Sequence, residues 1–122
     1  MRIAIHVGDI SLEAVLNEST TASALWEALP IEADGSVWGD EIYFPVPLDA
    51  EPEDAKEVVD MGEIAYWSPG SAFCIFYGRT PASRGDEIRP ASAVNPLGHI
   101  QGDATTLRGS RNGVRVTLER LE

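Results

Sequence analysis

Residues 62–78, with the sequence GEIAYWSPGSAFCIFYG, contain five of the nine aromatic residues of the 122-residue chain. Aromatic and β-branched residues fit a pleated, half-buried surface, whereas Ser-Pro-Gly-Ser is typical of a tight turn. The stretch therefore predicts a hairpin of two strands, 63–67 and 72–77, that turns at 68–71. We expect this hairpin to be the centre of a small β protein.

Alternation along the hairpin predicts which of its side chains face the core. The large residues assigned to the core are Trp67, Phe73, Ile75 and Tyr77, which leaves Ala72, Cys74 and Phe76 on the opposite face. Cys74 is the single cysteine of the chain and lies within an apolar strand. It is therefore interpreted as a buried structural thiol rather than a nucleophile.

The rest of the chain predicts further short strands around this hairpin. Alternation of apolar and polar residues indicates strands at 2–7, 11–16, 31–38, 41–44, 97–100 and 114–119. Pro45 and Pro47 take the chain out of the sheet, and Asn112-Gly113 marks a tight turn before the last strand. A long irregular stretch, 79–96, is expected to be a functional or mobile loop.

A single clear helix is expected between the second and third strands. Ala22, Leu25, Trp26 and Leu29 recur with the helical period and form one apolar stripe. Thr20 or Thr21 can cap its start, because a side-chain oxygen there satisfies a free backbone amide, and Pro30 ends it. A short helical turn is expected at 103–107, capped by Asp103.

About eight strands, one helix and no alternating βαβ pattern favour an all-β barrel. The sequence shows no internal repeat and no linker, and its length suits one domain, so residues 1–122 are taken as a single domain. The acidic run at 48–56 lacks the ligand spacing of a calcium loop and is interpreted as a solvated surface loop.

The charge of the chain argues against two classes of partner. Twenty acidic residues against nine basic ones give a net charge of −11, which repels phosphate backbones and anionic membranes. We therefore expect neither nucleic-acid nor membrane binding, and we expect a monomer or weak homodimer. With no leader and no long apolar run, the chain is interpreted as a cytoplasmic protein.

Motifs that carry chemistry are mostly missing from the sequence. The two histidines, His6 and His99, do not have the spacing of a metal site, so no metal is expected. No phosphate-binding loop or dinucleotide fingerprint occurs, so no cofactor is expected. Ser71 lacks the sequence of a nucleophile elbow. Asp40 and Glu41 are adjacent in a strand and point to opposite faces, so they cannot share one acid–base site.

What remains is a set of aromatic and polar residues that could line a ligand pocket. Such pockets are usually concave and aromatic, with a few polar groups. The candidate ligand-binding residues are Glu41, Tyr43, Tyr66 and Phe76 in strands, with Arg79 and Asn95 from the long loop. The same aromatics could instead simply fill the barrel, and the catalytic residues, if any, stay unknown.

Three motifs resemble those of a known family. The segments 39–44 (GDEIYF), 62–70 (GEIAYWSPG) and 76–83 (FYGRTPAS) are similar to signatures of the small prokaryotic cyclophilin-like proteins of unknown function. The helix start at Thr21, the Leu29-Pro30 pair and the segment 95–98 fit as well. This resemblance implies a closed eight-stranded barrel whose ends are plugged by the helix and by one or two helical turns, and it implies no established activity.

The segment 70–75 (GSAFCI) is also similar to the strand Gly-Ser-Gln-Phe-Phe-Ile of true cyclophilins, which are prolyl isomerases. On that match, Ala72 replaces the catalytic glutamine and Cys74 replaces a phenylalanine of the proline pocket. The Phe-His-Arg motif that carries the catalytic arginine is missing. An isomerase that loses both the arginine and the pocket should lose several kcal/mol of transition-state binding, as an order of magnitude.

Two classes of function therefore stay open at this stage. The favoured hypothesis is a ligand- or peptide-binding module without cyclophilin catalysis, for an unidentified small molecule or peptide. The alternative is an enzyme, either a degenerate prolyl isomerase or an accessory amide hydrolase, the latter by analogy with related barrels only.

Overall fold

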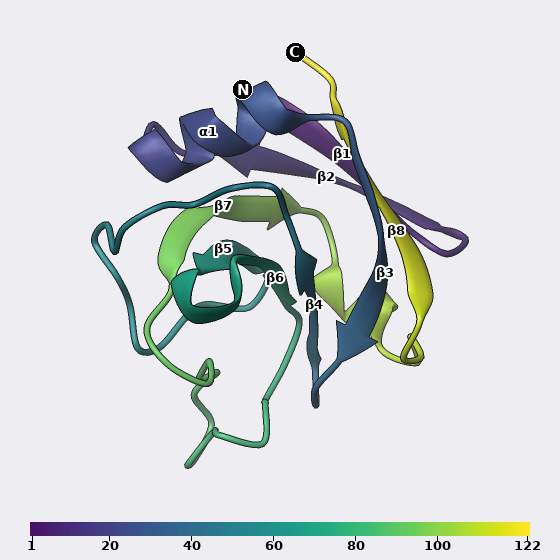
Figure 1. Cartoon of the computed structure of the whole chain (residues 1–122). Coiled ribbons are helices and arrows are strands. Elements are labelled where there is room, and N and C mark those ends of the chain that lie inside the picture. The colour runs from purple at the N-terminus through teal and green to yellow at the C-terminus, as the bar shows by residue number, and fades with distance from the viewer.

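The structure, a computed structural model, describes residues 1–122 and forms a closed antiparallel barrel of eight strands (Figure 1). The strands are β1 (Arg2–Val7), β2 (Ile10–Leu16), β3 (Ile31–Val37), β4 (Glu41–Pro45), β5 (Glu63–Trp67), β6 (Ala72–Phe76), β7 (Asn95–Gln101) and β8 (Val114–Arg120). The helical elements are α1 (Thr20–Ala28) and two 3₁₀ turns, η1 (Ser68–Gly70) and η2 (Ala104–Leu107). The prediction of a mainly β, eight-stranded barrel is confirmed.

The strands close in the order β1-β2-β7-β5-β6-β4-β3-β8, and β8 pairs with β1 to complete the ring. No strand is left with an unpaired edge, which removes the surface on which sheets aggregate. The two ends of the chain lie together (Figure 1), where the Arg2 amide donates to the Glu122 carbonyl oxygen at 2.7 Å.

The interior of the barrel is filled by 23 buried residues in one apolar cluster. β6 contributes Phe73 and Ile75, and the Phe73 ring packs against Phe44 of β4 with centroids 5.4 Å apart. Tyr77 also points inward, as predicted. Trp67 does not: it lies on the outer face and packs against the second cluster described below, so its assignment to the interior was wrong.

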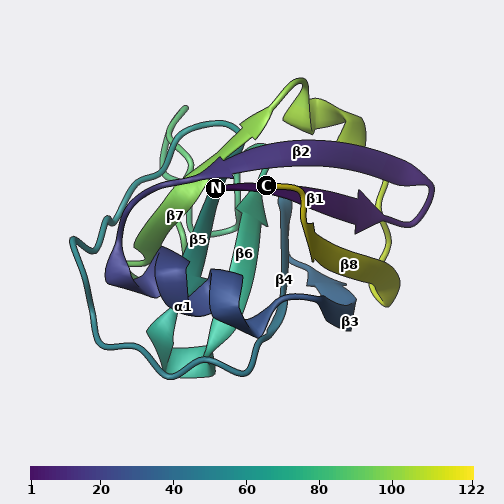
Figure 2. The same cartoon turned by 90° about the horizontal axis from the view of Figure 1, so that it is seen from above.

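The helix α1 closes the end of the barrel near the two termini (Figure 2). Its apolar stripe inserts Ala22, Leu25 and Leu29 into the barrel cluster. The N-cap is Ser19 rather than Thr20 or Thr21, because the Ser19 hydroxyl accepts from the Ala22 amide at 3.1 Å.

The acidic loop at 48–56 contacts this helix instead of being wholly solvated. Glu53 accepts hydrogen bonds from the Thr20 and Thr21 amides, each at 2.9 Å, and from the Thr21 hydroxyl at 2.7 Å. A carboxylate at a helix start is favourable because free amides and the positive end of the helix dipole meet there. These hydrogen bonds lower the pKa of Glu53.

The turn η2 adds Ala104 and Leu107 to the barrel cluster. Asp103 caps it as predicted, accepting from the Thr105 amide at 2.9 Å. No helix of the chain is long and apolar enough to span a membrane.

Candidate functional site

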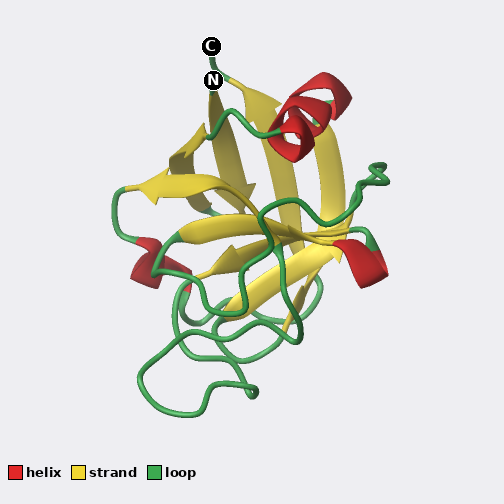
Figure 3. Ribbon diagram, turned by 90° about the vertical axis from the view of Figure 1, so that its left-hand side faces the viewer, coloured by secondary structure: helices red, strands yellow, loops and turns green.

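A second apolar cluster lies on the outer wall of the barrel, over β4, β6 and β5. Its seven buried members are Val59, Ala65, Ala72, Cys74, Phe76, Ile88 and Val94. They are covered by the irregular segment 77–94, which extends from the barrel in Figure 3. The strands β5 and β6 are therefore apolar on both faces, unlike strands that face water on one side.

The covering segment is held by backbone pairing with residues 56 and 59 and by hydrogen bonds within itself. Short bridges pair Lys56 with Val94 and Val59 with Ile88. The Thr80 hydroxyl donates to the Arg89 carbonyl oxygen. The segment is thus an ordered cover rather than a free loop.

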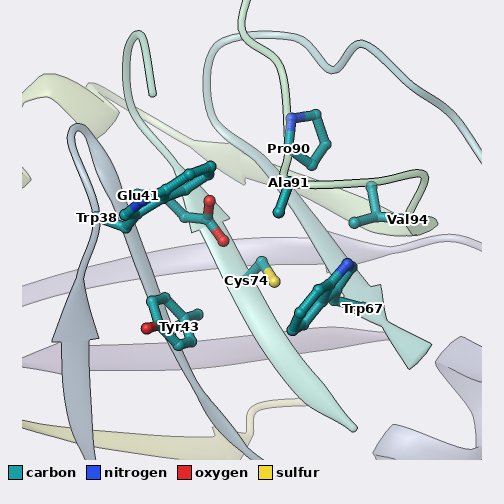
Figure 4. Close-up of a pocket in the computed structure, with 8 residues that line it drawn as sticks. All are labelled: Trp38, Glu41, Tyr43, Trp67, Cys74, Pro90, Ala91 and Val94. Atoms are coloured by element: carbon teal, nitrogen blue, oxygen red, sulfur yellow. The ribbon is translucent and has the colours of Figure 1, made fainter. Parts of the chain in front are cut away.

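A pocket of about 130 Å³ opens between this cover and the barrel wall (Figure 4). Its eight lining residues are Trp38, Glu41, Tyr43, Trp67, Cys74, Pro90, Ala91 and Val94. Strands β4, β5 and β6 supply the floor, because Glu41 and Tyr43 alternate onto the same outer face as Cys74. Most of the lining is apolar, and one carboxyl group reaches into it.

That carboxyl group belongs to Glu41, which is only 5% exposed. Its Oε1 atom has no hydrogen-bond partner in the protein. Burial raises the pKa of Glu41 from 4.5 to about 7, while a contact with the Cys74 thiol lowers that pKa slightly. No lysine, arginine or histidine lines the pocket, so no protein cation balances this group.

The Cys74 thiol lies beside Glu41 in the pocket floor and is 2% exposed. Burial, and secondarily the Glu41 charge, raise the pKa of the thiol well above its usual value. A thiol with a raised pKa is a poor nucleophile. The prediction of a buried thiol is confirmed.

Two tryptophans flank the carboxyl group on opposite sides of the pocket (Figure 4). The Trp67 indole nitrogen donates to the Ser92 hydroxyl at 2.7 Å, which joins the barrel wall to the cover. The sequence reasoning missed both Trp38 and Trp67. Trp67 could have been found from alternation, since it shares its face with Ala65.

The structure brings together only part of the predicted ligand-binding set. Glu41 and Tyr43 line the pocket. Phe76 lies on the same outer wall but is fully buried within the second cluster. Tyr66 points into the barrel, where its hydroxyl donates to the Leu48 carbonyl oxygen at 3.0 Å, so it does not lie near Glu41 and Tyr43.

The two residues of the predicted set that were expected in the long loop have other contacts, and Asn95 is not in that loop, because it begins strand β7. Arg79 is exposed and donates to the Ser83 carbonyl oxygen at 3.4 Å. Asn95 is 2% exposed and links the acidic loop to α1. Its Oδ1 accepts from the Glu53 amide at 2.9 Å, and its Nδ2 donates to the Glu51 carbonyl oxygen at 2.9 Å and the Thr21 hydroxyl at 3.2 Å.

A cluster of Asp60, Glu63 and His99 lies elsewhere, with ligand-type atoms within 4.8 Å of one another. Glu63 is buried there, and Lys56 donates to its two oxygens at 2.9 and 3.1 Å. The Asp60 amide donates to it as well, at 2.9 Å. The Glu63 charge is therefore already paired with an ammonium group.

Comparison with known proteins identifies the fold. The model of the family described as "Cyclophilin-like" matches residues 1–119. No curated protein matches the chain. A solution structure of the hypothetical protein AF2241 from Archaeoglobus fulgidus is 42% identical, with a TM-score of 0.83, over 99% of this chain and 95% of that one.

A more distant structure, McbB in complex with tryptophan, is 15% identical with a TM-score of 0.69. It covers 97% of this chain, and this chain spans only 44% of McbB. At that identity the likeness shows the shared fold alone.

Proposed function

The chain belongs to the cyclophilin-like family, and from that premise we propose that it is a binding protein for a compact, mostly apolar small molecule or side chain. The ligand would occupy the pocket between Trp38 and Trp67 on the outer wall. The observation that carries this proposal is the buried Glu41 carboxyl group, which has an oxygen without a partner.

A buried polar group without a partner costs about 1–3 kcal/mol, so such groups are rare in folded proteins. A ligand with a hydrogen-bond donor would satisfy the Glu41 oxygen and remove that cost. The rest of the lining offers apolar and aromatic surface, which is the usual composition of ligand pockets. The volume also suits a small ligand, since an apolar cavity of about 150 Å³ can hold benzene.

The binding proposal is tested by a fragment screen followed by amide chemical shifts in ¹H–¹⁵N spectra. Tryptophan belongs in the panel as one compound among many, because McbB was solved with it. We expect hits to shift residues 38–43, 67, 74 and 90–94 together. A screen without any hit, or hits that shift only other parts of the barrel, would contradict the proposal.

A pair of matched variants controls the screen. Ala91 is exposed at the pocket, so Ala91→Phe should block the entrance without disturbing a buried contact. Ala55 is exposed on the acidic loop and does not line the pocket, so Ala55→Phe adds the same ring elsewhere. Binding should weaken at least about tenfold in Ala91→Phe, which corresponds to 1.4 kcal/mol, and should be unchanged in Ala55→Phe.

A second candidate function is supported by the pKa of Glu41. A carboxyl group with a pKa of about 7 can act as a general acid or base at neutral pH. An enzyme that uses Glu41 would show turnover that falls at least about 100-fold in Glu41→Gln.

Prolyl isomerisation is one reaction to examine, with a coupled cis/trans peptide assay on the wild type, Glu41→Gln and Arg79→Ala. We expect no turnover above the uncatalysed rate. In the segment that resembles the active strand of cyclophilins, Ala72 stands in place of the catalytic glutamine and Cys74 in place of a phenylalanine of the proline pocket. Turnover that Arg79→Ala removes would instead favour the isomerase.

A further inference from the structure

We propose that the ligand of the outer pocket is an organic cation, a protonated amine carried on a compact apolar or aromatic body. The proposal rests on the binding function proposed above and names the chemical class of the ligand. It follows from three properties of the pocket: its unpaired acid, its two indole rings and the charge of the protein around it.

The first property is the unpaired carboxyl group of Glu41. Glu41 is buried in a pocket whose lining holds no basic residue, and one of its oxygens receives no hydrogen bond. Apart from the indoles and the Cys74 thiol beside Glu41, the lining has one more polar side chain, Tyr43, whose hydroxyl is turned away from the carboxyl group in Figure 4. A buried carboxylate needs a counter-charge, and an ammonium group supplies both that charge and N–H donors.

The aromatic walls favour the same class of ligand. Trp38 and Trp67 flank the space in front of Glu41 (Figure 4). The face of an indole ring attracts cations, and tryptophan does so best among the aromatic residues. Rings of this kind around a carboxylate suit an ammonium group that is stripped of most of its water.

The distribution of polar and apolar groups around the pocket also limits how a ligand can be oriented. Trp67 already donates its indole N–H to Ser92, so that donor is occupied and only the ring surface remains for the ligand. Pro90, Ala91 and Val94, from the covering segment, form the apolar side of the pocket that faces the barrel wall. An amine would therefore point to Glu41 while its hydrocarbon part contacts the cover.

The charge of the whole protein acts in the same direction. A net charge of −11 raises the local concentration of cations and repels anionic ligands. One other acid, Asp40, is near enough to act with Glu41 in raising the pKa of the Tyr77 hydroxyl, although Asp40 also pairs with Arg108 at 3.4 Å. The carboxylate of an anionic or zwitterionic ligand would be repelled by this negative charge and would find no basic side chain in the pocket lining.

The test compares probes of equal shape and different charge: benzylammonium with benzyl alcohol, and cyclohexylammonium with cyclohexanol. Affinities come from amide-shift titrations at pH 8 and low salt. We expect each ammonium to bind at least tenfold more tightly than its alcohol, with shifts at residues 38–43, 67 and 90–94. Equal affinities within a pair would overturn the cation proposal while leaving the binding function in place.

Binding of neither member of any pair, together with an empty fragment screen, would instead remove the binding function itself. The two failures are therefore distinguishable. Shifts by the ammonium probes that are confined to the exposed acidic loop at 48–56 would show general charge attraction and would also overturn the proposal.

Variants separate the pocket from the general charge. Glu41→Gln keeps the shape of the side chain and should weaken the ammonium probes at least tenfold while leaving the alcohols within twofold. Glu57→Gln removes one exposed charge just after the acidic loop, outside the pocket lining, and should change the affinity of neither class of probe. Trp38→Leu, which keeps an apolar residue, should weaken the ammonium probes more than the alcohols, and an equal loss for both classes would contradict a role of the ring in binding charge.

Discussion

The carboxyl group of Glu41 and the thiol of Cys74 meet in the floor of one pocket on the outer wall of the barrel (Figure 4). The two residues come from neighbouring strands, β4 and β6, in which Tyr43 pairs with Cys74 and Glu41 pairs with Phe76. Burial raises the pKa of the Glu41 carboxyl group. Burial, and secondarily the nearby Glu41 charge, raise the pKa of the Cys74 thiol. The outer wall thus holds an acid that is close to half protonated at neutral pH.

Stability should fall as pH rises because of Glu41. In the unfolded chain this group loses its proton near pH 4.5, whereas in the folded protein it does so near pH 7. Between these values the folded state binds more protons, so its stability decreases with rising pH and levels off above pH 7. The decrease is on the order of 3 kcal/mol at most.

Urea unfolding from pH 5 to pH 8.5 checks this expectation. Glu41→Gln should remove most of the decrease, because the amide does not titrate. Glu57→Gln, which removes an exposed carboxyl group outside the pocket, should keep the wild-type profile. Parallel profiles for the wild type and Glu41→Gln would mean that Glu41 is solvated or paired in solution.

Asn95 should be important for stability, since its side chain joins three segments. Asn95→Ala would take their partner from the part-buried Glu53 amide and Glu51 carbonyl oxygen and from the buried Thr21 hydroxyl. We expect a loss of roughly 2–4 kcal/mol in the free energy of unfolding. Asn112→Ala is the matched control, because Asn112 is exposed and accepts one hydrogen bond from the Val37 amide. Equal small losses in both variants would contradict a structural role for Asn95.

Closure of the barrel should depend on Gly98. A Cβ atom at this position would lie 1.9 Å from the Val15 carbonyl oxygen, in the pairing of β2 with β7. Gly98→Ala should therefore unfold the protein or shift its melting temperature down by more than about 10 °C. Gly102→Ala also changes a glycine with positive φ but meets no atom within 4 Å. Gly102→Ala should lower the melting temperature far less than Gly98→Ala. A comparable decrease in both variants would mean that the positive φ, and not the contact with Val15, causes the destabilisation.

Much of the fold could be predicted from the sequence because several strands, such as β2, β3 and β8, have only one buried face. In β8, for example, Val116 and Leu118 are buried and alternate with more exposed residues, so the pattern identifies both the strand and its inner side. The closed topology came from the family resemblance, which the match over residues 1–119 bears out.

The site was harder to predict because β5 and β6 are buried on both faces. Their burial patterns run almost without interruption, so apolar character does not tell which side is inside. Trp67 was placed inside and Tyr66 near Glu41 for that reason, whereas the structure has them the other way round. The cover at 77–94 carries no periodic pattern, so Pro90, Ala91 and Val94 could not be placed over the wall.

The most direct test of the account is the titration of Glu41 itself, followed by the ¹³C shift of its side-chain carboxyl from pH 3 to pH 9. Glu41→Gln assigns the signal, which the variant lacks. We predict a midpoint near pH 7 in the free protein, because the carboxyl group is buried in an apolar pocket without a cation. A midpoint near 4.5 would show a solvated or paired carboxylate and would contradict the pocket on which the proposed function depends.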